Sequence, residues 1–493
     1  MLLKDLSRGC LDAPERLEAL DITGIASDSR EVKPGTLFVA LPGPRTDGRL
    51  YLRQARERGA VAAVLEEGDG LSPEGKDASS EDPGIPLFRV PDARKTLGGL
   101  AARFYGTRDR SLCVTGITGT KGKTTTAWIL DTIVRSAGKV SALLGTVHNR
   151  IGERVFPSTN TTPGCLELHQ HLQELAARGG AHAVLEVSSH GILQRRAAGI
   201  EFRCGIFTNV APEHLDYHKT FESYVSAKRQ FFEELSPDAF AVLPREEPRS
   251  EDFARHTPAK VAWYGTRPQD GVEDIRTGTQ GTTFAWKGSR VQTRLWGQHN
   301  LLNLLGAMTA AGCLGFSRED VIRGAAAAGL PPGRLEEVPH PGPFRVFVDY
   351  AHTDGSLETV LRALRGITTG RLITIFGCGG DRDTTKRPRM GRVAEKWSDK
   401  VVVTSDNPRS EDPMAIIQHI VAGLEHPETA VCEADRRLAI ERGIRMARPN
   451  DTVLIAGKGH EDYQEFKGRK VHFDDREVAR EFLSVFPVPD GRS

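Results

Sequence analysis

One stretch constrains the fold of this chain more than any other: VTGITGTKGKTTTAWIL, residues 114–130. An apolar strand there runs into a loop of glycine, threonine and lysine, and a segment with helical spacing follows. Backbone N–H groups at the start of such a helix bind phosphate. A complete G-x-x-x-x-G-K-[ST] pattern ending at Lys123 and Thr124 would need glycine at Ile117, so the spacing is shorter. The alternative is a glycine- and threonine-rich turn that binds no ligand, and we favour the phosphate site. Lys123 would then contact the outer phosphates, and the Thr124 hydroxyl would contact magnesium.

Strands and helices alternate along most of the chain, which predicts an α/β fold with largely parallel sheets. Because 493 residues exceed what one hydrophobic core usually organises, we expect three domains, at 1–108, 109–334 and 335–493. A polar insert at residues 68–84 predicts a surface loop. The strand candidates are GTLFVAL, AVAAVLEE, SLCVTG, SALLGTV, AHAVLEVSS, RCGIFTNV, FAVL and KVAWYG, then FRVFVD, RLITIFG, KVVVTS, AVCE and DTVLIAG.

Charge and cysteine content exclude several classes of protein. Lys plus Arg total 66 against 65 for Asp plus Glu, so no long-range field gathers nucleic acid or an anionic membrane. The seven cysteines are scattered and never form C-x-x-C pairs, which argues against a disulfide framework or a zinc site. The chain also lacks an apolar run of about 18 residues. We expect a cytoplasmic protein without membrane insertion.

The segment HAVLEVSSHG carries Glu186, Ser188, Ser189 and His190 at the carboxyl end of a strand. Parallel sheets bind ligands at that edge. A carboxylate inside an apolar run needs a partner, and magnesium beside a nucleotide is one candidate, because it prefers oxygen ligands. An arginine in the sheet is the alternative partner, and the residues alone do not decide between them.

Lys228 falls on the apolar face of a predicted helix. A lysine at such a position usually packs its stem and leaves its amine in water, which on base rate is the favoured interpretation. The residues that define this apolar face are Phe221, Tyr224, Val225, Phe231, Phe232 and Leu235.

Two further segments carry candidate ligand contacts. In WGQHNLLN, the amides of Asn300 and Asn303 could read a purine edge, or could cap the helix that starts there. In PPGRLEEV, Arg334 could touch phosphate, or could form a surface salt bridge.

The last third of the chain repeats one arrangement three times. LITIFGCGGDRD, VVVTSDNPRSEDP and TVLIAGKGHEDYQ each run from an apolar strand into a polar loop, so we expect the three loops to meet at the carboxyl edge of one sheet. The mixture of cations and carboxylates in these loops suits a zwitterionic small molecule better than a polyanion. The candidates are Arg382, Asp406, Asn407, Arg409, Gly457 and Glu461.

Taken in order along the chain, these motifs resemble the Mur ligases, which are ATP-dependent amide-forming enzymes of peptidoglycan precursor synthesis. The motifs are GTKGKTT, NTTPG, EVSSHG, HLDYH followed by SAK, GQHN, GRLE, DYAHT, DNPR and GKGHEDYQ. The resemblance covers nearly the whole chain and implies a smaller N-terminal α/β domain for a uridine nucleotide, a central P-loop ATPase-type domain and a C-terminal Rossmann-like domain for the incoming amino acid. It also accounts for the short glycine spacing, since the family form is G-T-x-G-K-[ST].

The resemblance implies a role for each matched position. ATP contacts are Gly119, Thr120, Lys121, Gly122, Lys123, Thr124, Thr125, Asn300 and Arg334. Contacts to the UDP-sugar peptide are Ser29, Asn160, Thr161, Thr162, Ser188, Gln194 and Arg196. Amino-acid contacts are Arg382, Asp406, Asn407, Pro408, Arg409, Gly457 and Glu461. Magnesium would involve Thr124, Glu186 and a carbamylated Lys228, and the catalytic residues would be Lys123, Lys228 and His190.

DNPR and GKGHEDYQ are similar to the family members that add meso-diaminopimelate to UDP-N-acetylmuramoyl-L-alanyl-D-glutamate, and Arg409 would pair with the far carboxylate. We expect these two small molecules to be the substrates, and we expect the protein to be a monomer. An L-lysine-adding ligase, a folylpolyglutamate-synthase-like ligase and a non-enzymatic nucleotide-binding protein are the alternatives. The chain departs from the family pattern at Asp354–Gly355 and at residues 43–46, which leaves the contacts of both loops open.

Overall fold

The computed structural model describes residues 1–43, 46–68, 84–108, 111–278, 281–484, so most of the polar insert and residues 44 and 45 lie outside the described part. The chain divides into two compact units, residues 1–272 with 302–327 and residues 273–301 with 328–493. Across the described residues, no helix combines the length and apolar character needed to cross a membrane.

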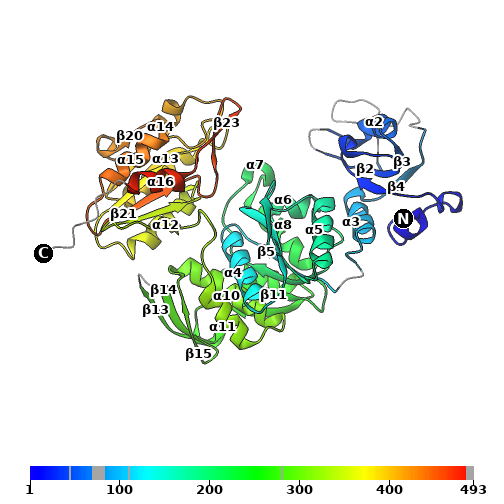
Figure 1. The fold of residues 1–493 in the computed structure, drawn as a ribbon, viewed down its shortest axis with the longest axis horizontal. Coiled ribbons are helices and arrows are strands. Elements are labelled where there is room, and N and C mark those ends of the chain that lie inside the picture. The colour runs from blue at the N-terminus through cyan, green and yellow to red at the C-terminus, as the bar shows by residue number, and fades with distance from the viewer. Residues whose placement is uncertain (44–45, 69–83, 109–110, 279–280, 485–493) are drawn as a thin grey trace. The chain divides into compact units, whose positions relative to one another are not determined.

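The first unit begins with a four-stranded parallel sheet in the order β1-β2-β3-β4 (Figure 1). Its strands are β1 Gly24–Ala26, β2 Thr36–Ala40, β3 Ala60–Glu66 and β4 Leu87–Val90. Its helices are α1 Leu3–Ser7, α2 Leu52–Glu57 and α3 Ala93–Phe104. Alternate residues of the central strands pack into two apolar clusters, since Leu37 and Val39 join one and Phe38 joins the other.

The second sheet of this unit has eight strands in the order β12-β11-β10-β5-β9-β6-β7-β8. The strands are β5 Cys113–Thr118, β6 Ser141–Leu144, β7 His148–Ile151, β8 Arg154–Pro157, β9 His182–Glu186, β10 Phe202–Phe207, β11 Phe240–Pro244 and β12 Lys260–Tyr264. The helices are α4 Lys123–Ser136, α5 Cys165–Ala177, α6 Ser189–Leu193, α7 Leu215–His218, α8 Phe221–Glu233, α9 Ser250–His256 and α11 Arg318–Ala327, with α10 Gln298–Cys313 running through the boundary between the two units. β5 lies between β10 and β9 and is parallel to both, so the phosphate loop leaves the interior of the sheet.

The second unit contains a three-stranded sheet of β13 Val272–Gly278, β14 Gly281–Trp286 and β15 Ser289–Thr293, and a six-stranded sheet in the order β16-β17-β21-β18-β19-β20. The strands of the larger sheet are β16 Glu336–Glu337, β17 Arg345–Asp349, β18 Leu372–Phe376, β19 Lys400–Val403, β20 Val431–Cys432 and β21 Thr452–Ala456; a hairpin of β22 Tyr463–Phe466 and β23 Arg469–His472 follows. Its helices are α12 Asp354–Arg365, α13 Lys386–Trp397, α14 Pro413–Val421, α15 Arg436–Arg445 and α16 Asp475–Ser484.

Helices cover both faces of the six-stranded sheet (Figure 1). Leu372 and Phe376 of β18 pack into the same cluster as residues of α12, α13 and α14, whereas Ile373 and Ile375 pack with residues of α15 and α16. Side chains alternate between the faces of a strand, so a strand buried on both sides is apolar throughout. The predicted α/β class and the predicted strands are confirmed.

Among the antiparallel pairs of the described residues, three are hairpins with two-residue turns. In β14–β15 and in β22–β23, the two-residue turns Lys287–Gly288 and Lys467–Gly468 have positive φ at both positions. The β7–β8 turn places Gly152 first, also with positive φ. Such turns match the right-handed twist of paired strands and join antiparallel neighbours. The sequence therefore contained a local signal for each hairpin that the strand–helix alternation concealed.

Candidate functional site

The phosphate loop is formed as predicted, between the end of β5 at Thr118 and the start of α4 at Lys123. Gly122, the residue before the helix, has a φ of +85°, and a Cβ there would collide with the amide of Asn303. Only glycine meets both conditions without strain. Asn303, one of the two amides that could read a purine edge, accepts a hydrogen bond from Thr126 Oγ1 (3.3 Å). It packs beneath the first turn of the helix.

The neighbouring strand β10 fixes the backbone of this loop. Asn209 accepts hydrogen bonds from the backbone N–H of Thr120 (2.8 Å) and, through Oδ1, from that of Lys121 (3.0 Å). Thr208 Oγ1 donates to the carbonyl of Lys121 (2.6 Å). Lys123 Nζ donates to the carbonyls of Gly119 (2.8 Å) and Thr120 (3.0 Å). Sequence reasoning missed Asn209, although it follows a buried strand at the ligand-binding edge.

Glu186, at the end of β9, is buried and accepts three hydrogen bonds. Thr124 Oγ1 (2.8 Å) and Thr146 Oγ1 (3.0 Å) donate to Oε2, and the backbone N–H of Thr146 donates to Oε1 (2.8 Å). The alternative of a Glu–Arg pair in the sheet is wrong, because these partners are hydroxyl and backbone groups. Thr146 follows β6 and had no signal of its own in the sequence.

Glu186 and Thr124 supply the hard oxygen donors that magnesium prefers. No set of three or more His, Cys, Asp or Glu side chains within the described residues is arranged to hold a metal. That agrees with magnesium, which usually takes one or two carboxylates and completes its shell with water and nucleotide phosphates. The donor set therefore fits magnesium bound together with a nucleotide.

Lys228 lies on α8 and is 1% exposed, so the interpretation of a solvated amine is wrong. Its Nζ donates to the carbonyl of Gly119 (2.9 Å) and lies 4.5 Å from the ring centroid of Tyr224. Burial, and secondarily the charge of Lys123, lowers the pKa of the Lys228 amine well below its usual value. The charge of Glu213 opposes this shift, but the described residues record no ion pair for Lys228, and burial favours the neutral, nucleophilic amine.

His190, on α6, belongs to a group of aromatic rings. Its ring centroid lies 4.2 Å from that of Tyr217 and 5.0 Å from that of His214. Burial lowers the pKa of His190, and the nearby His214 lowers it further. The neutral imidazole that results can accept a proton or serve as a ligand.

Most residues predicted to contact the UDP-sugar peptide are brought together by hydrogen bonds. Thr162 Oγ1 lies 3.1 Å from Ser188 Oγ, and Arg196 donates to the Thr162 carbonyl (2.9 Å) and to Gln194 Oε1 (3.0 Å). Thr146 Oγ1 also lies 3.1 Å from Thr161 Oγ1, which connects this group to Glu186.

Asn160 and Ser29 differ from that group. Asn160 precedes Thr161 and is exposed. Ser29 Oγ donates to Gln54 Oε1 (2.5 Å) beside the N-terminal sheet, and the described residues record no contact between Ser29 and the Thr162 group. Their substrate roles stay predictions.

Arg334 belongs to the second unit and stacks its guanidinium 4.8 Å from the ring centroid of Tyr350. Its Nε is buried and has no hydrogen-bond partner among the described residues. The described residues record no direct ion pair for Arg334, although its charge opposes the rise that burial causes in the pKa of the Asp349 carboxyl. Asn300 is also buried, and its Nδ2 donates to the carbonyl of Trp296 (3.0 Å). The ATP contacts of both residues stay predictions.

The three polar loops of the six-stranded sheet do meet at its carboxyl edge. The backbone N–H of Gly380, after β18, donates to the carbonyl of Asn407, after β19 (2.9 Å). Asn407 Nδ2 donates to Glu461 Oε2, after β21 (2.9 Å). Gly457 has a φ of +120° and lies against the Asp406 carboxylate, with 2.5 Å between a Cβ on residue 457 and Oδ2. A side chain at position 457 would thus displace Asp406.

Arg409 has a left-handed backbone, with a φ of +52°. The β22–β23 hairpin holds this conformation, because Arg409 N–H donates to the carbonyl of Glu465 (3.0 Å) and its own carbonyl accepts from Lys467 N–H (2.7 Å). Its Nη1 donates to the Gly380 carbonyl (2.7 Å) and its Nε lies 3.4 Å from Glu465 Oε2. Strained backbone held by its surroundings is frequent at ligand sites.

Two other candidates in these loops have different surroundings. Pro408 is buried directly before Arg409. Arg382 is exposed and makes no hydrogen bond within the described part of the chain. Its contact to the amino acid stays a prediction.

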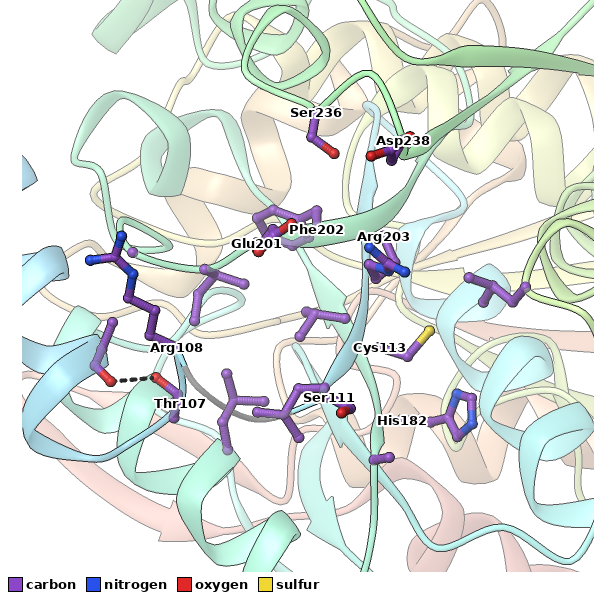
Figure 2. A pocket seen from close by; sticks show the side chains of 18 of the residues that line it. Thr107, Arg108, Ser111, Cys113, His182, Glu201, Phe202, Arg203, Ser236 and Asp238 are labelled. Atoms are coloured by element: carbon purple, nitrogen blue, oxygen red, sulfur yellow. Dashed lines mark hydrogen bonds between the residues drawn. The ribbon is translucent and has the colours of Figure 1, made fainter.

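A cavity of about 840 Å³ lies at the opposite edge of the eight-stranded sheet. Cys113, His182, Phe202 and Phe240, near the amino ends of β5, β9, β10 and β11, contribute to its lining; Figure 2 shows the first three. The phosphate loop follows the carboxyl end of β5. None of the predicted site residues lines this cavity.

The chain belongs to the Mur ligase family. Family models match at residues 21–105 (Mur ligase family, catalytic domain), 117–311 (Mur ligase middle domain) and 333–459 (Mur ligase, glutamate ligase domain). Two relatives named UDP-N-acetylmuramoyl-L-alanyl-D-glutamate--2,6-diaminopimelate ligase are each 42% identical to it: that of Solibacter usitatus covers 96% of both chains, and that of Geobacter metallireducens covers 95% of both. A solved structure with the same enzyme name aligns over 98% of this chain and 99% of that one, with a TM-score of 0.72 and 29% identity.

Proposed function

We propose that this chain is an ATP-dependent, ADP-forming ligase that adds meso-diaminopimelate to UDP-N-acetylmuramoyl-L-alanyl-D-glutamate in peptidoglycan precursor synthesis. The observation that carries the proposal is the group of Asn407, Arg409 and Glu461 at one sheet edge. This group offers a cation and a carboxylate to the zwitterionic end of an amino-acid substrate. The 42% identity to diaminopimelate ligases over 96% of the chain supports the same assignment.

The chemistry follows from the poor reactivity of a carboxylate toward an amine. An oxygen of the D-glutamyl side-chain carboxylate attacks the γ-phosphorus of ATP, and the bond to the bridging oxygen breaks to release ADP. The amine of the amino acid then attacks the acyl phosphate, an amide bond forms, phosphate leaves, and the amine loses its proton. Lys123 and the loop amides are positioned for the phosphates, and positioning is the main contribution of the protein.

Thr124 and Glu186 would hold magnesium, which supplies charge neutralisation at the transferring phosphoryl group. Lys228 is proposed to add to carbon dioxide through its neutral amine: an N–C bond forms, one proton is released, and the resulting carbamate is an anion that can share in holding the metal. The support is its burial and its lowered pKa. His190 is proposed to act beside this group as a neutral imidazole.

The domain boundaries at 108 and 334, the cytoplasmic location and the monomeric state are part of the same proposal. Three separate main sheets and three family matches support the boundaries. The scattered cysteines support the location. Sedimentation of the purified chain tests the monomer.

Phosphate release tests the function. Release should require ATP, the UDP-sugar dipeptide and diaminopimelate together, and the product should gain the mass of one diaminopimelate less water. ATP turnover that ignores both co-substrates would contradict a ligase. Use of L-lysine in place of diaminopimelate would favour the lysine-adding alternative, and use of a folate would favour the folylpolyglutamate alternative.

A further inference from the structure

Lys458 lies in the loop after β21 and is completely buried. Its Nζ lies 3.3 Å from Asn407 Oδ1 and 3.3 Å from Glu461 Oε2, and 5.2 Å from the ring centroid of Tyr463. Both oxygens belong to residues of the proposed amino-acid site. Burying a charged side chain is costly unless a partner compensates it, so a lysine here requires these contacts.

The contact with Lys458 fixes the amide of Asn407. Oδ1 accepts from Lys458 Nζ and from the backbone N–H of Glu465 (3.0 Å), while Nδ2 donates to Glu461 Oε2 (2.9 Å). Two donors facing Oδ1 and one acceptor facing Nδ2 allow a single orientation of the amide. The second N–H of Asn407 makes no hydrogen bond within the described residues.

The same contact divides the two oxygens of Glu461. Oε2 accepts from both Lys458 Nζ and Asn407 Nδ2. Oε1 has no hydrogen bond within the described part of the chain, and the side chain is 21% exposed. One oxygen is therefore held inward, and the other is available to an incoming ammonium group.

We propose that Lys458 is a positioning residue for the amino-acid substrate: it holds Asn407 and Glu461 so that one amide N–H and one carboxylate oxygen face the amino acid. The inference rests on the proposed function and extends it to a residue that does not touch the substrate. Without Lys458, the Glu461 carboxylate loses the contact that orients it, and Asn407 Oδ1 loses one of its donors. Loss of Lys458 should therefore weaken binding of the amino-acid substrate and leave binding of the other two substrates unchanged.

Lys458→Met tests this role, because methionine is of similar length and fits a buried site. We expect the KM for diaminopimelate to rise by about tenfold or more, the size expected for the loss of a hydrogen bond to a charged group. The KM values for ATP and for the UDP-sugar dipeptide should stay within about twofold, which also reports that the variant is folded. If the methionine variant does not fold, Lys458→Gln serves in its place, because it removes the charge that pairs with Glu461, and the KM for diaminopimelate should rise here too.

Lys470→Met is the matched control. Lys470 lies 4.0 Å from the same Tyr463 ring centroid but is exposed, and the hydrogen bonds of Asn407 and Glu461 do not involve it. Its removal should leave all three KM values unchanged. An unchanged KM for diaminopimelate in the Lys458 variants, or an equal rise of all three KM values, would overturn the positioning role.

A double-mutant cycle with Glu461→Gln separates action through Glu461 from a general effect on the loop. If Lys458 acts through Glu461, adding Lys458→Met to Glu461→Gln should raise the KM for diaminopimelate by less than about threefold further, because interacting residues are not additive. A full tenfold further rise would contradict this. If the wild-type chain does not use diaminopimelate at all, the proposed function fails; if it does and the cycle is additive, only the role of Lys458 fails.

Discussion

Among the described residues, two lysines, Lys228 and Lys458, are buried almost completely, and they differ in the partners of their amines. Lys228, at 1% exposure, contacts a backbone carbonyl and the ring of Tyr224, whereas Lys458, at 0%, contacts the carboxylate of Glu461 and the amide of Asn407. Burial and the charge of Lys123 lower the pKa of the Lys228 amine, although the charge of Glu213 opposes the shift, whereas Lys458 forms a direct ion pair with a carboxylate. The contrast supports the proposals that Lys228 takes part in the chemistry and that Lys458 arranges a binding site.

The largest effect is expected at Lys228. Lys228→Ala should lower kcat by about a thousandfold, because the anion proposed to form on Nζ is lost from the phosphoryl-transfer site. Short carboxylates such as acetate should restore part of the rate. Steady-state assays measure both. Lys219→Ala is the control, because the Lys219 side chain is exposed and its Nζ donates to the carbonyl of Asp216 (2.8 Å), and the rate of this variant should stay near that of the wild type. A wild-type rate in Lys228→Ala would remove the distinction between the two lysines.

The next largest effect concerns amino-acid selection beside Lys458. Arg409→Gly removes the guanidinium but tolerates the φ of +52°, so it separates the charge from the backbone conformation. We expect the preference for meso-diaminopimelate over L-lysine to fall by about tenfold to a hundredfold, since the far carboxylate would lose hydrogen bonds to a charged group, worth about 1.5 to 3 kcal/mol. Competition between the two amino acids, with products resolved by mass, measures it. A preference that survives the substitution would mean that Arg409 does not select the far carboxylate.

A smaller effect, on the pH dependence of stability, is expected at His169. Like Lys228, this base is buried, and it has no carboxylate among its recorded hydrogen-bond partners in the described residues. Its Nδ1 lies 2.7 Å from Thr107 Oγ1 and its Nε2 3.0 Å from the carbonyl of Ala198, and burial lowers the pKa of His169 to about 4. The unfolded chain takes up this proton near pH 6.5 and the folded chain does not, so stability is present above about pH 6.5 and is lost as the pH falls toward 4.

Denaturant unfolding at several pH values measures this contribution. Glutamine in His169→Gln is polar but does not titrate. As the pH falls from 6.5 to 5, the free energy of unfolding of the wild type should therefore decrease by about 2 kcal/mol more than that of the variant. Parallel stability curves for the two proteins would contradict the buried, neutral state of His169.

The sequence predicted the parts of the molecule that depend on local patterns. Apolar runs predicted the strands, the glycine–lysine motif predicted the loop between β5 and α4, and the helical spacing of α8 placed Lys228 on its apolar face. The burial of its amine could not be read from that face, because long side chains commonly reach water from such positions. It depends on the carbonyl of Gly119, 109 residues away in the chain.

The partners of the site residues were missed for the same reason. Asn209, Thr146 and Lys458 act through hydrogen bonds to residues distant in sequence or in neighbouring loops, and no periodicity marks them. Lys458 stands within GKGHEDYQ, where Gly457 and Glu461 drew attention as ligand contacts. Residues that hold a ligand contact in place become visible only when the side-chain partners are known.

The contrast between the two lysines is tested most directly by 13C NMR of the protein equilibrated with 13C-bicarbonate. The account predicts one carbamate resonance in the wild type, retained in Lys458→Met and absent in Lys228→Ala. No carbamate resonance in a fully active wild-type sample, or a resonance that persists in Lys228→Ala, would contradict it.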